Sequence, residues 1–382
     1  MTSFLVFTVL VLIGIALWQL TKIYDLTQIG NTSDNSEIAN DKDNSVNGYL
    51  MFAFVGFIYV FTIYSLYNWG ELVLGTPASE HGKDVDSLMS ISMALIFFVQ
   101  TFTQFLLHYF AFKYRGKEGK KALYFADNNK LEAIWTIIPV IVLAGLIMYG
   151  LYTWNNIMFV DEEDKQDAIV IELYAKQFGW EARYAGDDKT LGKANVRLIE
   201  GINTLGVDLA DPAAQDDKVV TELHLPVGKK IIFKMRSQDV LHSAYMPHFR
   251  AQMNCVPGMI TQFSFTPTVT TADMRNDAAI VAKVDKINKI RTKNSAKLVA
   301  EGGTALDPYT FDYLLLCNKI CGASHYNMQM KIVVDTPADF KSWLAEKPTL
   351  SQQWKEANAP KPVEAVGVPA ADSTKVVAQV IK

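Results

Sequence analysis

The feature that most constrains this chain is the confinement of its long apolar segments to the first 154 residues. They are residues 4–20, 49–69, 88–112 and 133–154. A helix rises about 1.5 Å per residue, so each segment can cross, or nearly cross, a bilayer that needs about 20 residues. After Trp154 no such stretch recurs, and charged residues make up 20% of the whole chain. The sequence therefore predicts N-terminal transmembrane helices followed by a water-exposed domain.

The loops predict an orientation. The loop between the third and fourth segments is basic, which marks the cytoplasmic side; it carries Lys113, Arg115, Lys117, Lys120, Lys121 and Lys130. The acidic loop 70–87 is expected outside, with everything after Trp154. The acidic linker 31–48 fits neither side well. The first segment could be a signal peptide, but no basic residue precedes it and no clean small-x-small pattern closes it, which favours a retained helix.

From about residue 166 the hydrophobic pattern has a period of two, which is typical of strands. AIVIELYAKQFGWEARY predicts a strand pair with a turn, and KKIIFKMR places Ile231, Phe233 and Met235 on one face. Turns rich in Pro and Gly then favour a β-sandwich or barrel. Two segments are predicted to be insertions, 186–216 and 270–310, each either a docking surface or a solvated loop or short helix. The tail 345–382 is predicted to be flexible.

The run CNKICGASHYNM, residues 317–328, concentrates soft metal ligands. Cys317 and Cys321 offer thiolates, His325 an imidazole and Met328 a thioether, a set that suits copper better than magnesium or calcium. Two thiolates on one short loop can bridge two metals, so a two-copper cluster is predicted if a second histidine contributes. A disulfide between the cysteines is the alternative, but it would leave His325 and Met328 unexplained.

The second histidine must come from the other five in the chain. His242 follows the strand KKIIFKMR, and strand ends commonly present ligands. His248 is the competitor, although a surface or interface position is expected for it. His224 is expected to point to solvent, because its neighbours Leu223 and Leu225 should face inward. Cys255 is expected to be a small buried hydrophobe.

Three motifs together resemble subunit II of haem–copper cytochrome oxidases: SQDVLHSAYMP, NCVPGM and CNKICGASHYNM. The resemblance implies a membrane-anchored chain with N-terminal transmembrane helices plus an all-β, cupredoxin-like Greek-key barrel. It also implies a binuclear copper centre, CuA, in which two cysteines bridge the coppers and one histidine caps each. Carried over to this sequence, the ligands are His242, Cys317, Lys319 through its backbone carbonyl, Cys321, His325 and Met328.

The segment NNKLEAIWTIIPVIVL also resembles this family, where a similar sequence opens the second of two helices. Glu132 matches a glutamate that marks the mouth of a proton path into subunit I; the alternative is an ordinary interfacial charge. The helices expected at 4–20 and 49–69 exceed the family's two. They suggest additional membrane contacts, for example with another respiratory complex.

Two positions depart from the family pattern. Lys319 stands where a glutamate usually ligates magnesium, and an ammonium group cannot coordinate a cation, so the magnesium site is expected to be altered or lost. Phe178 stands where a tryptophan usually receives electrons from cytochrome c. Trp180 follows two residues later, and strand alternation predicts both rings on one face. A tethered or supercomplex-bound cytochrome c therefore becomes a more plausible donor than a freely diffusing one.

The resemblance implies subunit II of a bacterial cytochrome c oxidase in the inner membrane, with its CuA domain on the periplasmic face. It would take electrons from cytochrome c and pass them to haem in subunit I, where oxygen is reduced to water with proton translocation. Its partners would be oxidase subunits, cytochrome c and lipid; nucleic acid is not expected. The alternative is a membrane-anchored copper chaperone, which would require a thioredoxin-like βαβ pattern around the cysteines. The expected divisions of the chain are 1–48, 49–87, 88–155, 166–344 and 345–382.

Overall fold

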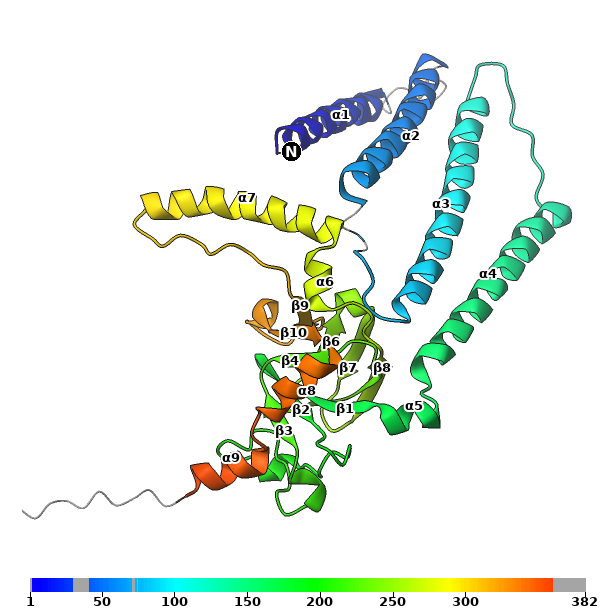
Figure 1. Ribbon diagram of the computed structural model, residues 1–382. Coiled ribbons are helices and arrows are strands. Elements are labelled where there is room, and N and C mark those ends of the chain that lie inside the picture. Colours follow the sequence, from blue (N-terminus) through cyan, green and yellow to red (C-terminus); the bar gives the residue numbers. More distant parts are fainter. Residues whose placement is uncertain (1, 30–40, 71–72, 74, 360–382) are drawn as a thin grey trace, which may run out of the picture. The chain divides into compact units, whose positions relative to one another are not determined.

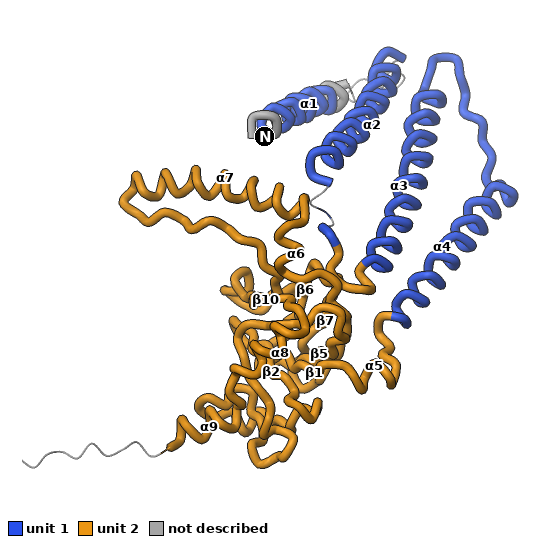
Figure 2. Tube along the Cα trace, viewed as in Figure 1, with its two compact units in different colours: residues 1–76, 83–156 blue, residues 77–82, 157–382 orange. Residues whose placement is uncertain are grey.

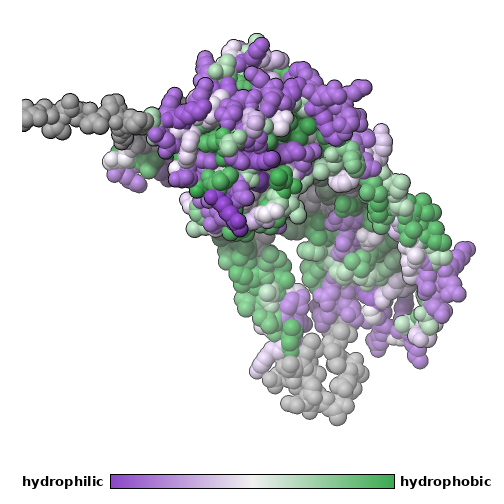
Figure 3. All heavy atoms as spheres, turned by 90° about the horizontal axis from the view of Figure 1, so that it is seen from below, coloured by the Kyte–Doolittle hydropathy of each residue, from purple (hydrophilic) through white to green (hydrophobic). Residues whose placement is uncertain are grey.

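The computed structural model describes residues 2–29, 41–70, 73 and 75–359. Within it the chain forms two units (Figure 2). The helical unit comprises Met1–Thr76 and Lys83–Asn156, and the β unit comprises Pro77–Gly82 and Ile157–Lys382. Hydrophilic side chains crowd over the compact part of the chain, whereas hydrophobic side chains cover the long helices (Figure 3). The predicted division between apolar helices and a water-exposed domain is therefore confirmed.

Four long helices make up the helical unit: α1 (Thr2–Ile29), α2 (Asp41–Trp69), α3 (Gly82–Lys113) and α4 (Asn129–Met158) (Figure 1). Within the described residues, these four are long and apolar enough to cross a membrane. Each extends beyond the apolar segment that predicted it, because polar flanking residues continue the helix. Large apolar side chains lie exposed along them, as expected for surfaces that face lipid rather than water.

The start of α2 packs against the end of α3. The Phe112 ring lies 5.0 Å from the Tyr49 ring, and Gly48 permits this approach, since a Cβ there would come within 2.6 Å of Phe112. The backbone N–H of Glu118 donates to the carboxylate of Asp41 over 2.8 Å. The acidic start of α2 therefore lies on the same side as the basic loop after α3. Residues 31–40 of the acidic linker lie outside the described residues.

The β unit contains two five-stranded sheets. The first has the order β3-β2-β1-β5-β8 and the second the order β4-β10-β9-β6-β7. The strands of the first sheet are β1 (Ile169–Lys176), β2 (Gly179–Tyr184), β3 (Lys218–Val220), β5 (Ile231–Ser237) and β8 (Thr261–Phe265). Those of the second are β4 (Leu223–Pro226), β6 (His242–Met246), β7 (Ala251–Cys255), β9 (Tyr313–Cys317) and β10 (Gln329–Asp335). Most pairs are antiparallel, but β1 with β5 and β4 with β10 are parallel.

One hydrophobic core joins the two sheets. Ile231, Phe233 and Met235 of β5 are fully buried, as their alternation predicted, and they share this core with Leu315 of β9 and Ile332 of β10. Burying each large apolar side chain contributes about 1.5–3 kcal/mol. The ends of β6 and β9 are thereby held on a rigid scaffold. Short helices connect the elements, among them α5 (Glu162–Asp167), η5 (Pro247–Phe249) and η6 (His325–Asn327).

The segment 186–216 consists of loops and two short 3-10 helices that pack onto the β unit, which fits the short-helix alternative, and its docking role stays a prediction. It contains η3 (Val196–Leu198) and η4 (Pro212–Ala214), and Leu205 and Val207 are buried with Tyr174 in a second hydrophobic cluster. Gly192 lies so close to Ala214 that a Cβ on it would come within 2.4 Å of the Ala214 Cβ. The segment therefore packs as part of the β unit.

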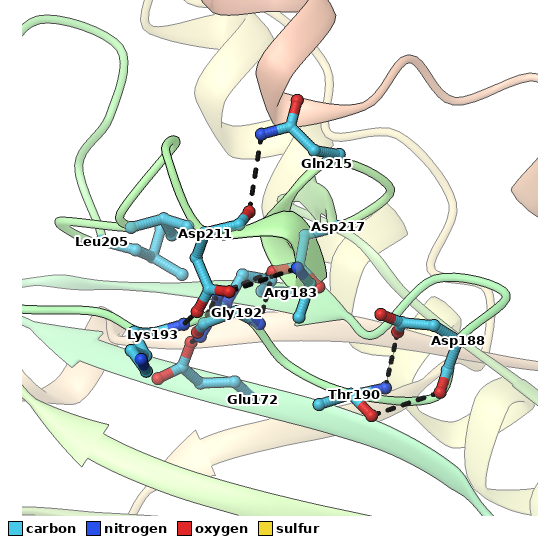
Figure 4. A network of polar contacts seen from close by, with 12 residues as sticks. Glu172, Arg183, Asp188, Thr190, Gly192, Lys193, Leu205, Asp211, Gln215 and Asp217 are labelled. Atoms are coloured by element: carbon cyan, nitrogen blue, oxygen red, sulfur yellow. Dashed lines mark hydrogen bonds and ion pairs between the residues drawn. The ribbon is translucent and has the colours of Figure 1, made fainter.

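Next to this segment Arg183 lies between Glu172 and Asp217 (Figure 4), and Arg236 completes a buried ion cluster with them. Arg183 donates to Glu172 over 2.6 Å and to Asp217 over 2.8 Å, and Arg236 donates to the other oxygen of Glu172. Asp217 also accepts from the Gly192 N–H. Burial raises the pKa of Asp217 to about 6, although Arg183 acts in the opposite direction. Two cations and two carboxylates thus balance within the chain.

The other expected insertion, 270–310, is dominated by a long helix rather than a loop or short helix. It comprises α6 (Thr271–Arg275) and the 23-residue α7 (Ala278–Ala300). The expected flexible tail is also folded at its start, where α8 (Pro337–Ala345) and α9 (Leu350–Ala357) follow β10. Leu350 is only 2% exposed and belongs to the second cluster. Residues 360–382 of that tail lie outside the described residues.

Candidate metal centre

Neighbouring strand ends bring the predicted ligands together. His242 begins β6 and Cys317 ends β9, and these antiparallel strands pair with Ala244 opposite Cys317. The ligand loop, residues 317–328, then closes back onto the sheet, where the Cys317 N–H donates to the Met328 carbonyl over 3.1 Å. His325 lies in η6 within this loop. Strand register therefore sets His242 beside a loop that is distant in sequence.

The two sulfur atoms lie at the centre of the site. Cys317 Sγ is 3.9 Å from Cys321 Sγ and 3.8 Å from His242 Nδ1. The Lys319 carbonyl oxygen lies 3.2 Å from Cys317 Sγ. His242 is fully buried and Cys321 is 5% exposed. One group of donors therefore surrounds Cys317.

A second group surrounds Cys321. His325 Nδ1 lies 3.6 Å and Met328 Sδ 3.8 Å from Cys321 Sγ. Within the described residues, His242, Cys317 and Cys321 place their ligand atoms within 4.8 Å of one another, and His325 falls outside that set. Each sulfur thus has a histidine of its own.

These separations fit ligands of a metal ion. A disulfide would need sulfurs about 2.05 Å apart, so the two cysteines are free thiols. Two sulfurs at about 2.3 Å from one tetrahedral metal lie roughly 3.8 Å apart, and a sulfur and an imidazole nitrogen roughly 3.5 Å apart. Thiolate, imidazole and thioether donors together favour copper. The predicted donor set can therefore hold copper without rearrangement.

The sulfurs need a cation to be held as a thiolate pair. Burial, together with the neighbouring Cys317, raises the pKa of the Cys321 thiol to about 11. Metals bind cysteine as thiolate, so metal binding must release these protons and becomes weaker as the pH falls. Without a metal the thiols therefore stay protonated, and a soft cation would take the place of their protons.

The sequence reasoning missed Asp239. Its carboxylate accepts a hydrogen bond from His242 Nε2 over 2.8 Å and one from the Gln177 N–H over 2.7 Å. Burial opposes its ionisation, but the hydrogen bonds from Gln177 and His242 hold the Asp239 pKa below its ordinary value. A proton fixed on Nε2 leaves Nδ1 free to face Cys317. The signal was a carboxylate three residues before a candidate ligand.

Phe178 and Trp180 do not share a strand face, so that prediction is wrong. Phe178 lies in the turn between β1 and β2, where strand alternation no longer applies, and is 40% exposed, whereas Trp180 is 5% exposed. Both nevertheless lie beside the ligands. The Trp180 ring is edge-on to His242 at 6.3 Å. A Cβ on Gly322 would come within 2.8 Å of the Phe178 ring.

The other candidate ligands lie elsewhere. His248 is partly buried and packs edge-on against Phe311 and Tyr313. His224 does not point to solvent, since its Nδ1 lies 2.5 Å from the Asp335 carboxylate. Cys255 is buried as expected, and burial raises its pKa to about 12.

Two predicted residues of other roles are exposed. Glu132 lies in the first turn of α4, in the helical unit, where its N–H donates to the Asn128 carbonyl. Lys319 lies in the ligand loop, with its backbone oxygen directed towards Cys317.

A helical anchor, a two-sheet β unit and a loop of soft ligands are the features of a membrane-anchored protein with a candidate copper site. Two family models match the chain: cytochrome C oxidase subunit II, transmembrane domain, over residues 67–153, and cytochrome C oxidase subunit II, periplasmic domain, over residues 169–273. The second match stops before α7 and the ligand loop.

The alternative cytochrome c oxidase subunit 2 of Bradyrhizobium diazoefficiens is 31% identical over 294 residues, covering 76% of this chain and 88% of that protein. Cytochrome c oxidase subunit 2 of Thermostichus vulcanus is 24% identical, covering 71% and 77%. The periplasmic domain of subunit II (CoxB) of Bradyrhizobium japonicum superposes with a TM-score of 0.27 at 17% identity, covering 46% and 91%. The chain belongs to the cytochrome c oxidase subunit II family, and its membrane-anchored cupredoxin-like fold follows from that membership.

Proposed function

We propose that this chain holds a binuclear copper centre, CuA. The observation that carries the proposal is the pairing of each sulfur with its own histidine, Cys317 with His242 and Cys321 with His325. One metal would need only one such group. The Lys319 carbonyl and Met328 would be the weaker ligands, one in each group. When bound, the two coppers would supply a one-electron redox couple.

The proposed reaction is that of an electron-transfer subunit within the oxidase complex. The chain takes electrons from a cytochrome c and passes them to haem in subunit I, where oxygen is reduced to water with proton translocation. Family membership supports this role, and so does the scaffold. The ligands lie on two core strands and on a loop that is hydrogen-bonded to them, so they should move little when the charge of the copper centre changes. Subunit I, other oxidase subunits and the bilayer are the proposed partners.

Electrons are proposed to enter through Phe178 or Trp180. Phe178 is exposed and touches the ligand loop, so it can meet a donor directly. Trp180 is buried against His242, so it can only relay electrons that have already entered through the exposed Phe178. The absence of an exposed indole at this turn supports a tethered or supercomplex-bound cytochrome c as donor. Unchanged electron-transfer rates in both Phe178→Ala and Trp180→Ala would remove both rings from the route.

Glu132 is proposed as the mouth of a proton path. Its exposure in the first turn of α4 supports this role, because a carboxylate there can collect protons from water. Proton pumping that persists in Glu132→Gln would contradict it.

The magnesium site is proposed to be altered or lost, since Lys319 offers an ammonium group. Stoichiometric magnesium bound beside Lys319 would contradict that.

We also propose that the bilayer is a bacterial inner membrane and that the β unit lies on its periplasmic face. The basic loop after α3 supports this orientation, because basic loops lie on the cytoplasmic side. The start of α2 is hydrogen-bonded to this loop, so α2 also begins on the cytoplasmic side and runs outward. The additional helices α1 and α2 would then meet further membrane partners, such as another respiratory complex.

A membrane-anchored copper chaperone is the rival function. Its thioredoxin-like βαβ pattern has no counterpart around the described cysteines, where β9 and β10 form a hairpin joined by the ligand loop. Low-temperature electron paramagnetic resonance of the purified complex separates the two functions. An unpaired electron shared by two copper nuclei gives seven hyperfine lines, together with two coppers per chain. A four-line spectrum and one copper would instead favour a single-copper protein.

A further inference from the structure

Helix α7 projects from the β unit as an arm of fixed conformation (Figure 1). Asn288 ties it to the returning segment in both directions, donating to the Tyr309 carbonyl and accepting from the Tyr309 N–H. Arg291 donates to the Asp307 carbonyl over 2.8 Å. At the base of the arm, Ile280 is 3% exposed. These contacts occupy one face of the helix and leave the opposite face to solvent.

The free face carries a lysine stripe, which we define as Lys283, Lys286, Lys289, Lys293 and Lys297. All five are exposed. At 3.6 residues per turn they fall within an arc of about 120° and span roughly 21 Å along the helix. None of the five forms a salt bridge among the described residues. Asp285, the acidic residue of α7, lies at the margin of the stripe next to Lys289.

Such a stripe works against the helix that bears it. Lysines three and four positions apart repel one another, and this repulsion destabilises an isolated helix. No acidic residue within the stripe offsets this repulsion between the lysines. Ile290, which is 61% exposed, lies among these lysines. A cluster of lysines on one exposed helix face is typical of a helix that is attracted to an anionic lipid surface.

The base of α7 lies at the edge of the β unit where the chain passes into α3. Ala78, four residues before α3 begins at Gly82, donates its N–H to the His248 carbonyl and accepts from the Thr268 N–H. Ile280 in the first turn of α7 is buried in the same hydrophobic core as Ala78, so the first turns of α7 are close to this edge. The arm therefore starts beside the point at which the β unit connects to a membrane-spanning helix.

We propose that the lysine stripe of α7 binds the anionic headgroups of phospholipids on the side of the membrane that carries the β unit. Charge complementarity supports phosphate-bearing lipids, and the exposed Ile290 suits the adjacent acyl boundary. The origin of the arm favours a bilayer over a soluble partner. This surface is independent of the copper ligands, so its failure would leave the proposed function untouched.

Lysine reactivity in the intact oxidase tests the proposal. The purified complex is placed in nanodiscs of zwitterionic phosphatidylcholine alone, or with about a third phosphatidylglycerol, and briefly acetylated before mass spectrometry. We expect the stripe lysines to react about fivefold more slowly in the anionic discs, and the difference to vanish at high salt. Lys341 and Lys355, exposed on α8 and α9, serve as internal controls whose rates should not change. Free glycerol phosphate at the same phosphate concentration should not protect the stripe in zwitterionic discs.

Two outcomes would overturn the proposal. Equal reactivity in both discs, with slower reaction only in native membranes, would assign the stripe to an acidic protein partner instead. Protection by free glycerol phosphate alone would reduce it to a phosphate site unrelated to the bilayer. A variant with Lys286, Lys289 and Lys293 replaced by glutamine should retain less phosphatidylglycerol on purification, whereas a Lys341→Gln and Lys355→Gln variant should not.

Discussion

The ligand loop and the buried ion cluster both concentrate polar side chains in the β unit, but they balance charge differently. In the ion cluster, Arg183 and Arg236 meet Glu172 and Asp217, so the chain supplies every counter-charge. In the ligand loop, two free thiols face two imidazoles, and the charge changes only when a metal replaces the thiol protons. A cluster of balanced charges is complete within the chain, whereas a set of soft metal donors needs an ion from outside. This difference separates the functional site from a structural one of similar polarity.

Removing a sulfur should produce the largest effect. Cys317→Ser and Cys321→Ser each delete the sulfur at the centre of one donor group, which would also bridge the two proposed coppers, so copper affinity should fall by more than about 100-fold, beyond the loss expected for an outer partner. Copper content and oxygen uptake of the purified complex measure this. Cys255→Ala is the matched control and should retain its copper. A full copper content in either serine variant would contradict the assignment of the ligand loop as the metal site.

Breaking the ion cluster should damage the fold instead. Arg183→Met leaves Asp217 buried without its ion-pair partner and leaves Glu172 with Arg236 alone, which costs about 3–5 kcal/mol of stability. Chemical unfolding followed by fluorescence would measure it. Lys176→Met removes the more exposed Lys176–Glu181 pair and should cost less than about 1 kcal/mol. Equal costs for both variants would show that burial of the cluster is energetically unimportant.

A smaller effect on copper binding is expected from Asp239, which contacts a proposed ligand without being one. Asp239 belongs to the chain's own hydrogen-bond network but orients the proposed ligand His242. Asp239→Asn should weaken copper retention about 10- to 100-fold without unfolding the β unit. Competition with a copper chelator, alongside circular dichroism, would separate the two effects. If unfolding and copper loss always occur together, Asp239 is structural and not a positioning residue.

The smallest effect concerns a polar group that belongs to neither cluster. Burial, and then the charges of Lys283 and Arg250, lower the pKa of His248 from 6.5 to about 4. The unfolded chain therefore binds this proton more readily, so the stability due to neutral His248 is complete above pH 6.5. It is lost as the pH falls through 4. Thermal unfolding at pH 7 and pH 5 should show a smaller drop for His248→Phe than for the unmodified chain; identical drops would exclude His248 as the source.

Some features could be predicted because they are local. Apolar length marked the four helices, and alternation identified Ile231, Phe233 and Met235 as core. The chemistry of Cys317, Cys321, His325 and Met328 indicated a copper site from residue types within one short run. These are properties of neighbouring residues, and no distant contact is needed to express them.

The rest depended on contacts between distant segments. Phe178 lies in a turn and is exposed, whereas Trp180 lies in β2 and is buried. Residues of 186–216 and Leu350 of α9 are ordered by packing into the second hydrophobic cluster. Sequence by itself determined which side chains could bind copper and which segments are apolar enough to span a membrane. The residue types left both His242 and His248 open, and only the tertiary structure shows by contact that His242 lies beside the sulfurs, because the pairing of β6 with β9 sets His242 beside Cys317 while His248 packs against Phe311.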